Sequence, residues 1–355
     1  FYTSSTENFE KVPGSPVAYW VSDAMLRAFE VGQALNDVAQ PRQGIATADN
    51  NRFLRLWSEI DYHKFGLSMS KEQAKNSTRK WFPYNKGGDF RKWYGNNDFV
   101  VNWENDGAEM KTFKNSVIRN PSFHFRESVT WTLISSAPTA FRYKPQGHLF
   151  DVAGMSMFPS MDKLKYIFGF CNTAIVREML MILAPTLNYQ VGDIARLPII
   201  FAEPTIVVDE LVDKNISISR ADWDAFETSW DFKKHPLLKN VFINKVKHRG
   251  QEWEYENCKN DPNSAIKLVS SRKLINTNTD ITSIITGDEL ISVAFKAWGQ
   301  ECENRFNTLK TNEEELNRIF IDIYGLQDEL TPEVEDKDVT VYRIFDSKED
   351  ISESM

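Results

Sequence analysis

Cysteine is scarce in this chain of 355 residues, which contains only Cys171, Cys258 and Cys302. Three widely spaced thiols exclude a disulfide framework and a zinc site built from cysteines, and they favour a reducing compartment. The five histidines share no spacing that is typical of metal ligands. We therefore expect no metal site in this chain.

Long apolar runs are also missing. The most apolar segment, Met161 to Leu183, is interrupted by charges such as Lys165 and Arg177, and its longest uncharged run has about eleven residues. A helix that crosses a membrane needs roughly 20 apolar residues. The segment instead predicts one long buried helix, from about Asp162 to Leu183, that ends before Pro185.

The common catalytic motifs do not occur. The chain has no glycine-rich phosphate loop, no dinucleotide-binding fingerprint, no metalloprotease helix and no nucleophile elbow. The tetrapeptide "NPSF", Asn120 to Phe123, approaches the Asn-Pro-Pro-Tyr/Phe motif with which amino-methyltransferases hold a flipped base. It lacks the second proline, and no glycine-rich cofactor loop precedes it. We interpret it as a turn and assign no catalytic residue. A nuclease is the least favoured class, because no nuclease motif is present.

Charge is plentiful but unevenly distributed. The net charge is −8, yet residues 1–200 hold 23 Lys and Arg against 19 Asp and Glu, whereas residues 201–355 hold 19 against 31. Within the first part, residues 64–92 carry eight bases and two acids. Such asymmetry is typical of a protein whose basic part meets a polyanion.

The stretch "KWFPYNKGGDFRKWYGNND", residues 80–98, concentrates this positive charge. We predict a strand–turn–strand element with its aromatic rings partly buried and its bases and amides facing a nucleic acid. Lys and Arg can neutralise phosphates, a Gly–Gly pair allows close approach of backbone, and Asn or Arg can read purine edges. A solvated basic face is the alternative. The residues predicted to contact a nucleic acid are Lys86, Arg91 and Lys92 at its backbone, Asn50, Asn51, Arg52 and Asn85 near a groove, and Arg142 and Gln190 as weaker candidates.

Local patterns predict an α+β fold. Short β-type runs bounded by turn residues include "DFVVNWEN", "VTWTLISS", "FRYKP" and "HLFDVAG". A helix is expected at "SDAMLRAFEVGQAL", with Ser22 or Asp23 as its cap, and another at "ADWDAFETSWDFKKHPLLKN", ending before Pro236. Two further helices are expected near the C-terminus, the second beginning with a capping box at Thr311 and ending at Gly325.

Five stretches resemble one known family. They are "GIATADNNRFLRLW", "KWFPYNKGGDFRKWYGNNDFVVNWENDG", "TLNYQVGDIARLPII", "FETSWDFKKHPLL" and "NEEELNRIFIDIYGLQDELTPEVEDKDVTV". They resemble the BREX phage-defence adenine methyltransferases of the PglX family, over nearly the whole chain and most weakly at about 241–290. The resemblance implies a bacterial cytoplasmic protein with an S-adenosyl-L-methionine-binding domain, a target-recognition domain and a helical C-terminal region. It also implies N6 methylation of one adenine in a short DNA site, which marks self DNA.

The chain departs from the family because it lacks the cofactor loop and the Asn-Pro-Pro-Tyr motif, and it begins with Phe. We interpret it as a fragment that follows the catalytic domain, inactive by itself and without S-adenosyl-L-methionine. The expected partners are double-stranded DNA and other BREX proteins or an acidic phage inhibitor. A non-catalytic protein-docking module of a defence complex is the alternative. The expected parts are the end of the methyltransferase domain with a connector (1–40), a β-rich target-recognition domain with an embedded helix (41–200), a linker and helical spacer (201–290), and a helical C-terminal region (291–355).

Overall fold

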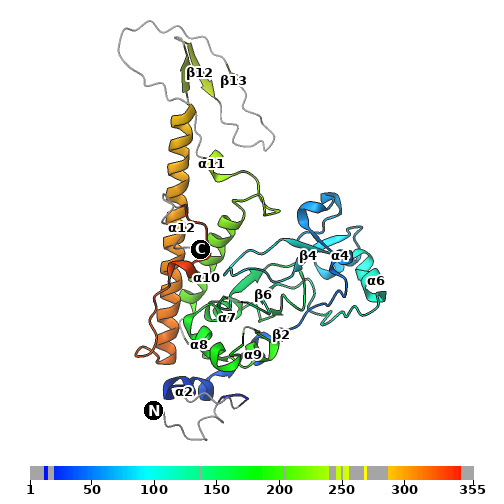
Figure 1. The fold of residues 1–355 in the computed structure, drawn as a ribbon, viewed down its shortest axis with the longest axis vertical. Coiled ribbons are helices and arrows are strands. Elements are labelled where there is room, and N and C mark those ends of the chain that lie inside the picture. Colours follow the sequence, from blue (N-terminus) through cyan, green and yellow to red (C-terminus); the bar gives the residue numbers. More distant parts are fainter. Residues whose placement is uncertain are drawn as a thin grey trace.

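The computed structural model describes residues 12–14, 20–135, 137–186, 188–202, 205–239, 245–248, 251–255, 268–269 and 287–344. Figure 1 shows a lobe of sheets beside two long helices, α10 and α12. Sheets and helices are both well represented, and the C-terminal part is helical. The predicted α+β class is therefore confirmed.

Two four-stranded sheets form the sheet lobe. In the first, β2 (Pro41–Arg42), β9 (Ser156–Met157), β6 (Ser128–Trp131) and β7 (Phe141–Lys144) follow one another in antiparallel order. In the second, the order is β3 (Leu54–Leu56), β5 (Phe99–Asn102), β4 (Trp81–Asn85) and β8 (Leu149–Phe150), with only the β4–β8 pair parallel. Strands predicted near "DFVVNWEN", "VTWTLISS", "FRYKP" and "HLFDVAG" are thus confirmed.

Two smaller sheets complete the β-structure. One pairs β1 (Gln33–Ala34) with β10 (Pro198–Ile199), and the other joins β11 (Lys245–His248), β12 (Gln251–Tyr255) and β13 (Leu268–Val269). The shorter helices are α3 (Leu35–Ala39), α4 (Asn50–Phe53), α5 (Lys71–Lys75), α6 (Glu104–Thr112), α9 (Val191–Ala195) and α11 (Pro236–Lys239).

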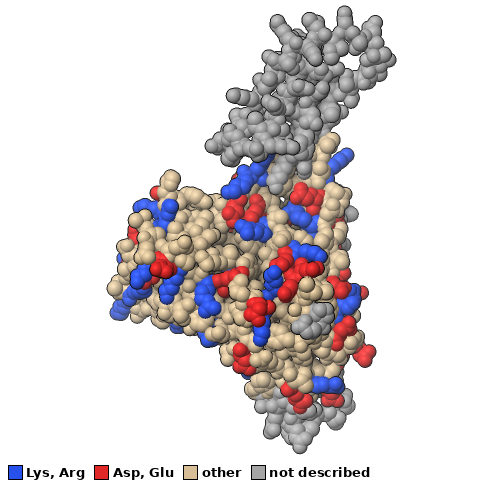
Figure 2. Space-filling model, turned by 180° about the vertical axis from the view of Figure 1, so that it is seen from behind, with Lys and Arg blue, Asp and Glu red and all other residues tan. Residues whose placement is uncertain are grey.

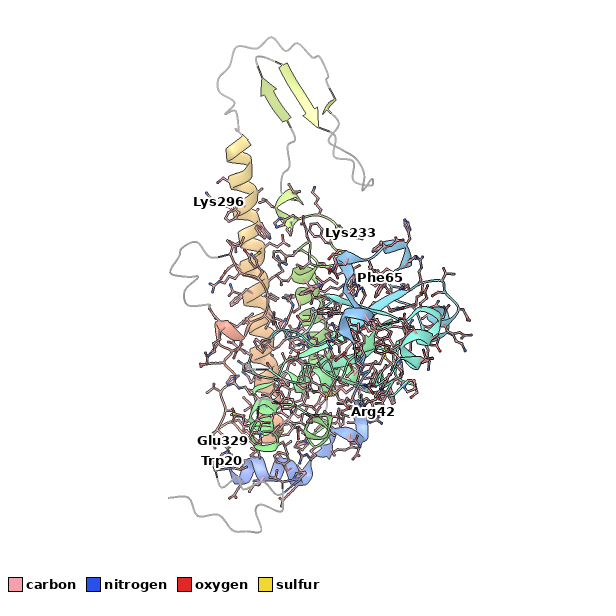
Figure 3. The ribbon with its side chains drawn as sticks, turned by 45° about the vertical axis from the view of Figure 1, so that its right-hand side comes forward. Trp20, Arg42, Phe65, Lys233, Lys296 and Glu329 are labelled. Atoms are coloured by element: carbon pink, nitrogen blue, oxygen red, sulfur yellow. The ribbon has the colours of Figure 1, made fainter. Side chains whose placement is uncertain are left out.

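Helix α2 (Asp23–Val31) begins where the sequence predicted. The side chain of Ser22 accepts a hydrogen bond from the backbone N–H of Met25 at 3.1 Å, which is the bond of an N-terminal cap. The Ser22 hydroxyl also donates to Glu329 at 2.7 Å, so this cap ties α2 to the segment that follows α12. Figure 3 labels Glu329 at the base of the molecule, close to α2.

The predicted long helix at 162–183 is wrong. It is divided into α7 (Leu164–Cys171) and α8 (Ala174–Leu183), which are bent by 71°. At the break, the side chain of Asn172 accepts from the backbone N–H of Phe141 at 3.0 Å and donates to its carbonyl at 3.2 Å. The amide therefore binds strand β7 where a continuous helix would pass. No single helix in the described ranges is long and apolar enough to cross a membrane, although this bent pair together meets the length and composition limits.

Helix α12 (Gly287–Tyr324) corrects a second prediction, because its 38 residues replace the two expected C-terminal helices. At 1.5 Å per residue it is about 57 Å long. The helix continues through Thr311, and Glu314 does not close a capping box but accepts a hydrogen bond from Val334 at 3.3 Å. The predicted end is confirmed. Gly325 has φ +67°, and its N–H and that of Leu326 bond back to the last turn.

The helix expected to end before Pro236 is also wrong. Residues 221–223 instead complete α10 (Ile206–Trp223), turns follow, and α11 begins at Pro236, where the missing N–H of proline costs nothing. Helix α10 packs on α7 and on α12, so the main core lies between these helices and the first sheet. A second cluster of buried apolar residues forms the core at the other four-stranded sheet.

Candidate nucleic-acid interface

Asn85, predicted to lie near a DNA groove, is buried at 1% exposure, so that orientation is wrong. Its amide nitrogen donates to the hydroxyl of Thr130 and to the carbonyl of Gly154 at 2.8 Å, which joins β4 of one sheet to β6 of the other. The glycine pair beside it approaches other parts of the chain closely. A Cβ on Gly87, which has φ +90°, would lie 2.9 Å from the carbonyl oxygen of Ala153.

Arg91 and Lys92, predicted for the DNA backbone, point toward the helical part instead. The guanidinium of Arg91 pairs with Asp222 of α10 at 2.8 Å, and its side chain is 17% exposed. The Lys92 ammonium pairs with Glu313 of α12, with side chains 9% and 3% exposed. Glu313 also accepts from the indole of Trp93 at 2.6 Å. These two ion pairs hold the sheet lobe against the helices. Because a carboxylate already neutralises each cation, neither is available to a phosphate.

Arg142 is the most deeply buried of the nine predicted residues, so its expected exposure is wrong as well. Its guanidinium donates to the carbonyl of Arg91 at 3.1 Å and to the hydroxyl of Thr132 at 2.9 Å. Burial and the nearby charge of Arg91 lower its pKa to about 10, so it remains charged at neutral pH. Burial lowers the pKa of the neighbouring Lys144 well below its ordinary value, and that ammonium donates to the carbonyl of Gly95 at 2.8 Å.

Two predicted residues from separate segments are brought together at the surface. Asn50, the first residue of α4, and Lys86 both line a hollow of about 250 Å³, together with Thr47 and Asp151. The ammonium of Lys86 pairs with Asp151 at 2.8 Å and remains 26% exposed on its side chain. The oxygen of the Asn50 amide accepts from Thr47 at 2.7 Å. Asn50 therefore presents its amide N–H₂ donors at a polar opening.

Asn51 and Arg52 are exposed on the same short helix. Arg52 pairs with Glu109 at 2.7 Å, and its guanidinium lies over the ring of Phe113 at 5.1 Å. Its side chain is 51% exposed, so water screens this pair strongly. Arg52 is thus positioned where a phosphate could compete for it.

Gln190 lines another polar hollow. It measures about 540 Å³ and is lined by Pro41, Arg42, Gln43, Asn120, Gln190, Val191 and Gly192. Asn120 donates from its amide to the carbonyl of Gln43 at 2.8 Å, so the "NPSF" segment is held as a turn against β2. The predicted turn is confirmed. We call the surface formed by residues 41–52, 119–126 and 190–192 the loop face.

The loop face contains cations that the sequence did not single out. The guanidinium groups of Arg42 and Arg126 lie 5.0 and 5.1 Å from the ring centre of Phe123. Nearby, the ammonium of Lys71 donates to the carbonyl of Pro121 at 2.7 Å. Figure 3 labels Arg42 on the sheet lobe, away from the upper part of α12 that Lys296 marks. The sequence does contain a signal for a cationic surface here, because two arginines flank a turn with aromatic residues in "RNPSFHFR".

In the part of the chain that the structure describes, the sheet lobe carries several cations that have no carboxylate partner. In Figure 2 Lys and Arg lie along the outer part of this lobe with some Asp and Glu among them, and acidic residues are more frequent over the helical part. Among the described residues, the ion pairs within this part of the chain include Arg52–Glu109, Lys80–Glu104, Lys86–Asp151, Lys111–Asp106 and Arg196–Asp193. Within the described ranges no carboxylate pairs with Arg42, Lys71, Lys75, Lys114 or Arg126.

The architecture and the loop face define an α+β protein with a basic, amide-lined surface, and comparison with known proteins adds its family. The chain is 38% identical over 351 residues to the adenine-specific methyltransferase PglX of Lacticaseibacillus casei (strain Zhang), covering 96% of this chain and 26% of that protein. It is 36% identical over 244 residues to the adenine-specific methyltransferase BrxX of Escherichia coli O9:H4 (strain HS), covering 68% of this chain and 19% of that protein. No family model matches the chain.

Identity at this level over most of the chain shows that it belongs to the PglX/BrxX family. The chain spans about a quarter of the length of the first of these relatives and about a fifth of the second.

Proposed function

We propose that this chain is the DNA-recognition portion of a longer adenine-N6 methyltransferase that marks self DNA in BREX phage defence. The observation that carries the proposal is the unpaired charge of the loop face and its surroundings, in a chain related to adenine-specific methyltransferases. S-adenosyl-L-methionine and the catalytic Asn-Pro-Pro-Tyr motif belong to the rest of the protein. This chain chooses which adenine is flipped and modified.

The loop face suits this task chemically. Arg126 on this face and Lys71 beside it have no carboxylate partner among the residues that the structure describes, so both can contact phosphates without first breaking an ion pair. Amides and guanidinium groups nearby can read base edges, as phosphate contacts position a protein and base contacts specify the site. Each neutralised phosphate lowers the slope of log K against log salt by about 0.9. Four such contacts weaken binding about a hundredfold between 50 and 200 mM salt.

The test is a map of N6-methyladenine in host DNA by single-molecule sequencing, with the full-length protein that carries this chain expressed. We expect one short motif to be methylated, and a Lys71→Ala, Arg126→Ala double variant to reduce the methylated fraction without changing the motif. The matched control is Lys233→Ala, Lys296→Ala, which removes two exposed cations that lie away from the loop face. If the unaltered protein leaves no N6-methyladenine in host DNA, the proposed methyltransferase activity is refuted.

A protein-docking role is the second candidate. Helix α12 exposes Val293 at 61% and Phe295 at 43%, and residues 201–355 carry the excess of negative charge. These features suit other BREX proteins as partners of the helical part. Binding measured at 50 and 200 mM salt separates the two roles, because contacts with apolar side chains do not weaken steeply as salt rises.

A further inference from the structure

Gly192 is a glycine whose presence the fold does not explain. It lies inside the first turn of α9, and its φ is outside the left-handed region that favours glycine. A Cβ built on it would meet no atom within 4 Å, so no neighbour requires the space. Glycine is less favourable than alanine in a helix. The open space at Gly192 belongs to the 540 Å³ hollow, and a partner that approaches the backbone closely there would explain the residue.

The side chains around Gly192 keep free hydrogen-bonding groups. Arg42 uses two of its five N–H groups, donating to the carbonyl of Pro41 at 2.9 Å and to the amide oxygen of Gln40 at 3.3 Å. Gln190 donates from its amide nitrogen to Asn188 at 2.9 Å and is exposed. An amide and a guanidinium group that line the same hollow as an accessible backbone form a site that can read an edge of a purine.

The rest of the hollow is held in place. Asn120 is fixed by its hydrogen bond to the carbonyl of Gln43, and Arg196 donates to the carbonyl of Gly192 at 3.1 Å. The ring of Phe123 further orients Arg42, and Arg126 contacts the same ring. A rigid surround limits the positions that Arg42 and Gln190 can take, which direct readout of a base requires.

We propose that this hollow is the base-reading site, with Arg42 and Gln190 as specificity-determining residues and Gly192 as the point of closest approach to DNA. The assignment rests on the proposed function and deepens it. A Gln side chain pairs in a bidentate manner with adenine, and Arg with guanine, through their major-groove edges. The recognised site therefore contains a purine whose identity these two side chains set. Lys71 and Arg126, which contact Pro121 and Phe123, bind phosphates near this site.

Methylation mapping of the full-length protein tests this assignment. Gln190→Ala is expected to relax the motif at one purine position or to lower the methylated fraction roughly tenfold or more. Arg42→Lys keeps the charge but loses the fork of donors, so it should change base preference more than overall methylation. In Gly192→Leu the side chain occupies the space through which DNA would reach the backbone, so this variant should abolish methylation. Gly192→Ala should lower it while leaving the thermal midpoint unchanged or raised, because alanine favours the helix.

Matched controls separate a lost site from a lost fold. Gln327→Ala removes an exposed amide that likewise makes one side-chain hydrogen bond, to Asp322. Gly299→Ala changes a helical glycine whose Cβ would meet only Ile344 at 3.9 Å. Neither should alter the motif. An unchanged motif and fraction in both Gln190→Ala and Gly192→Leu overturns the base-reading assignment and leaves the proposed function intact. No methylation by the unaltered protein overturns the proposed function itself.

Discussion

Removing Lys92 should be among the most damaging single changes in the chain. The Lys92→Met variant leaves the Glu313 carboxylate 3% exposed, with only the Trp93 indole still donating to it. Breaking a buried ion pair in this way costs about 3 to 5 kcal/mol, because an uncompensated charge stays inside the protein. Typical domains have only about 5 to 15 kcal/mol of total stability. We therefore expect the variant to lose a large part of its free energy of unfolding.

The pH dependence of the loss identifies its cause. Burial raises the pKa of Glu313 above its ordinary value, while Lys92 and Trp93 act in the opposite direction. Without Lys92 the pKa rises further, so the folded state binds a proton that the unfolded state does not. The destabilisation is small below the pKa of Glu313 in the unfolded state, near 4.5, and develops as the pH rises through its pKa in the folded state. Lys92→Met should consequently lose more stability at pH 8 than at pH 5.

Urea unfolding at both pH values measures this effect by linear extrapolation. Lys165→Met is the matched control, because its pair with Asp213 is 42% and 54% exposed and should contribute little. A Lys92→Met, Glu313→Met double variant should be milder than Lys92→Met alone, since apolar replacement of a whole buried pair is often neutral. A loss below about 1 kcal/mol at pH 8, with no difference at pH 5, would refute the buried-pair explanation.

Three further outcomes are expected. Burial lowers the pKa of His124 to about 4 and of His148 to about 3, so the free energy of unfolding should fall as the pH drops from about 6.5 toward 4. Unfolding at pH 7 and 5 checks this, and a His124→Phe, His148→Phe variant should lose part of the dependence. Gly325→Ala should destabilise the protein by roughly 1 to 2 kcal/mol, because φ is +67° there; the urea midpoint measures it. Asn172→Ala should cost about 1 to 3 kcal/mol by the same assay, since the N–H of Phe141 loses its partner while its carbonyl keeps only the bond from the N–H of Trp93. An unchanged midpoint would contradict that role.

Local signals in the sequence were sufficient for some elements. Ser22 as a cap and Gly325 as the end of α12 follow from the chemistry of one or two residues, and both are confirmed. The break between α7 and α8 was missed because its cause, the bond from Asn172 to Phe141, joins residues 31 positions apart. The continuity of α12 was missed because Thr311 and Glu314 also fit the inside of a helix.

The candidate site was also hard to predict where contacts join residues that are far apart in the sequence. Composition correctly indicated a basic half, and Asn50, Asn51, Arg52 and Gln190 do lie at the surface. The run at 80–98 was misread because the partner acids of Arg91 and Lys92 are 131 and 221 residues away. Charge along a sequence does not tell whether a distant carboxylate meets it in the fold.

The pairing of Arg91 and Lys92 with the helices has a consequence for chimaeras made between relatives. Asp222 also accepts from the backbone of Tyr342 at 2.9 Å and lies 3.8 Å from Arg305, so one carboxylate serves the sheet lobe, α12 and the segment beyond it. A chimaera that transplanted the sheets alone would leave Asp222 and Glu313 facing foreign side chains. The smallest graft that carries its own counter-ions therefore includes α10 and α12 as well as the sheets.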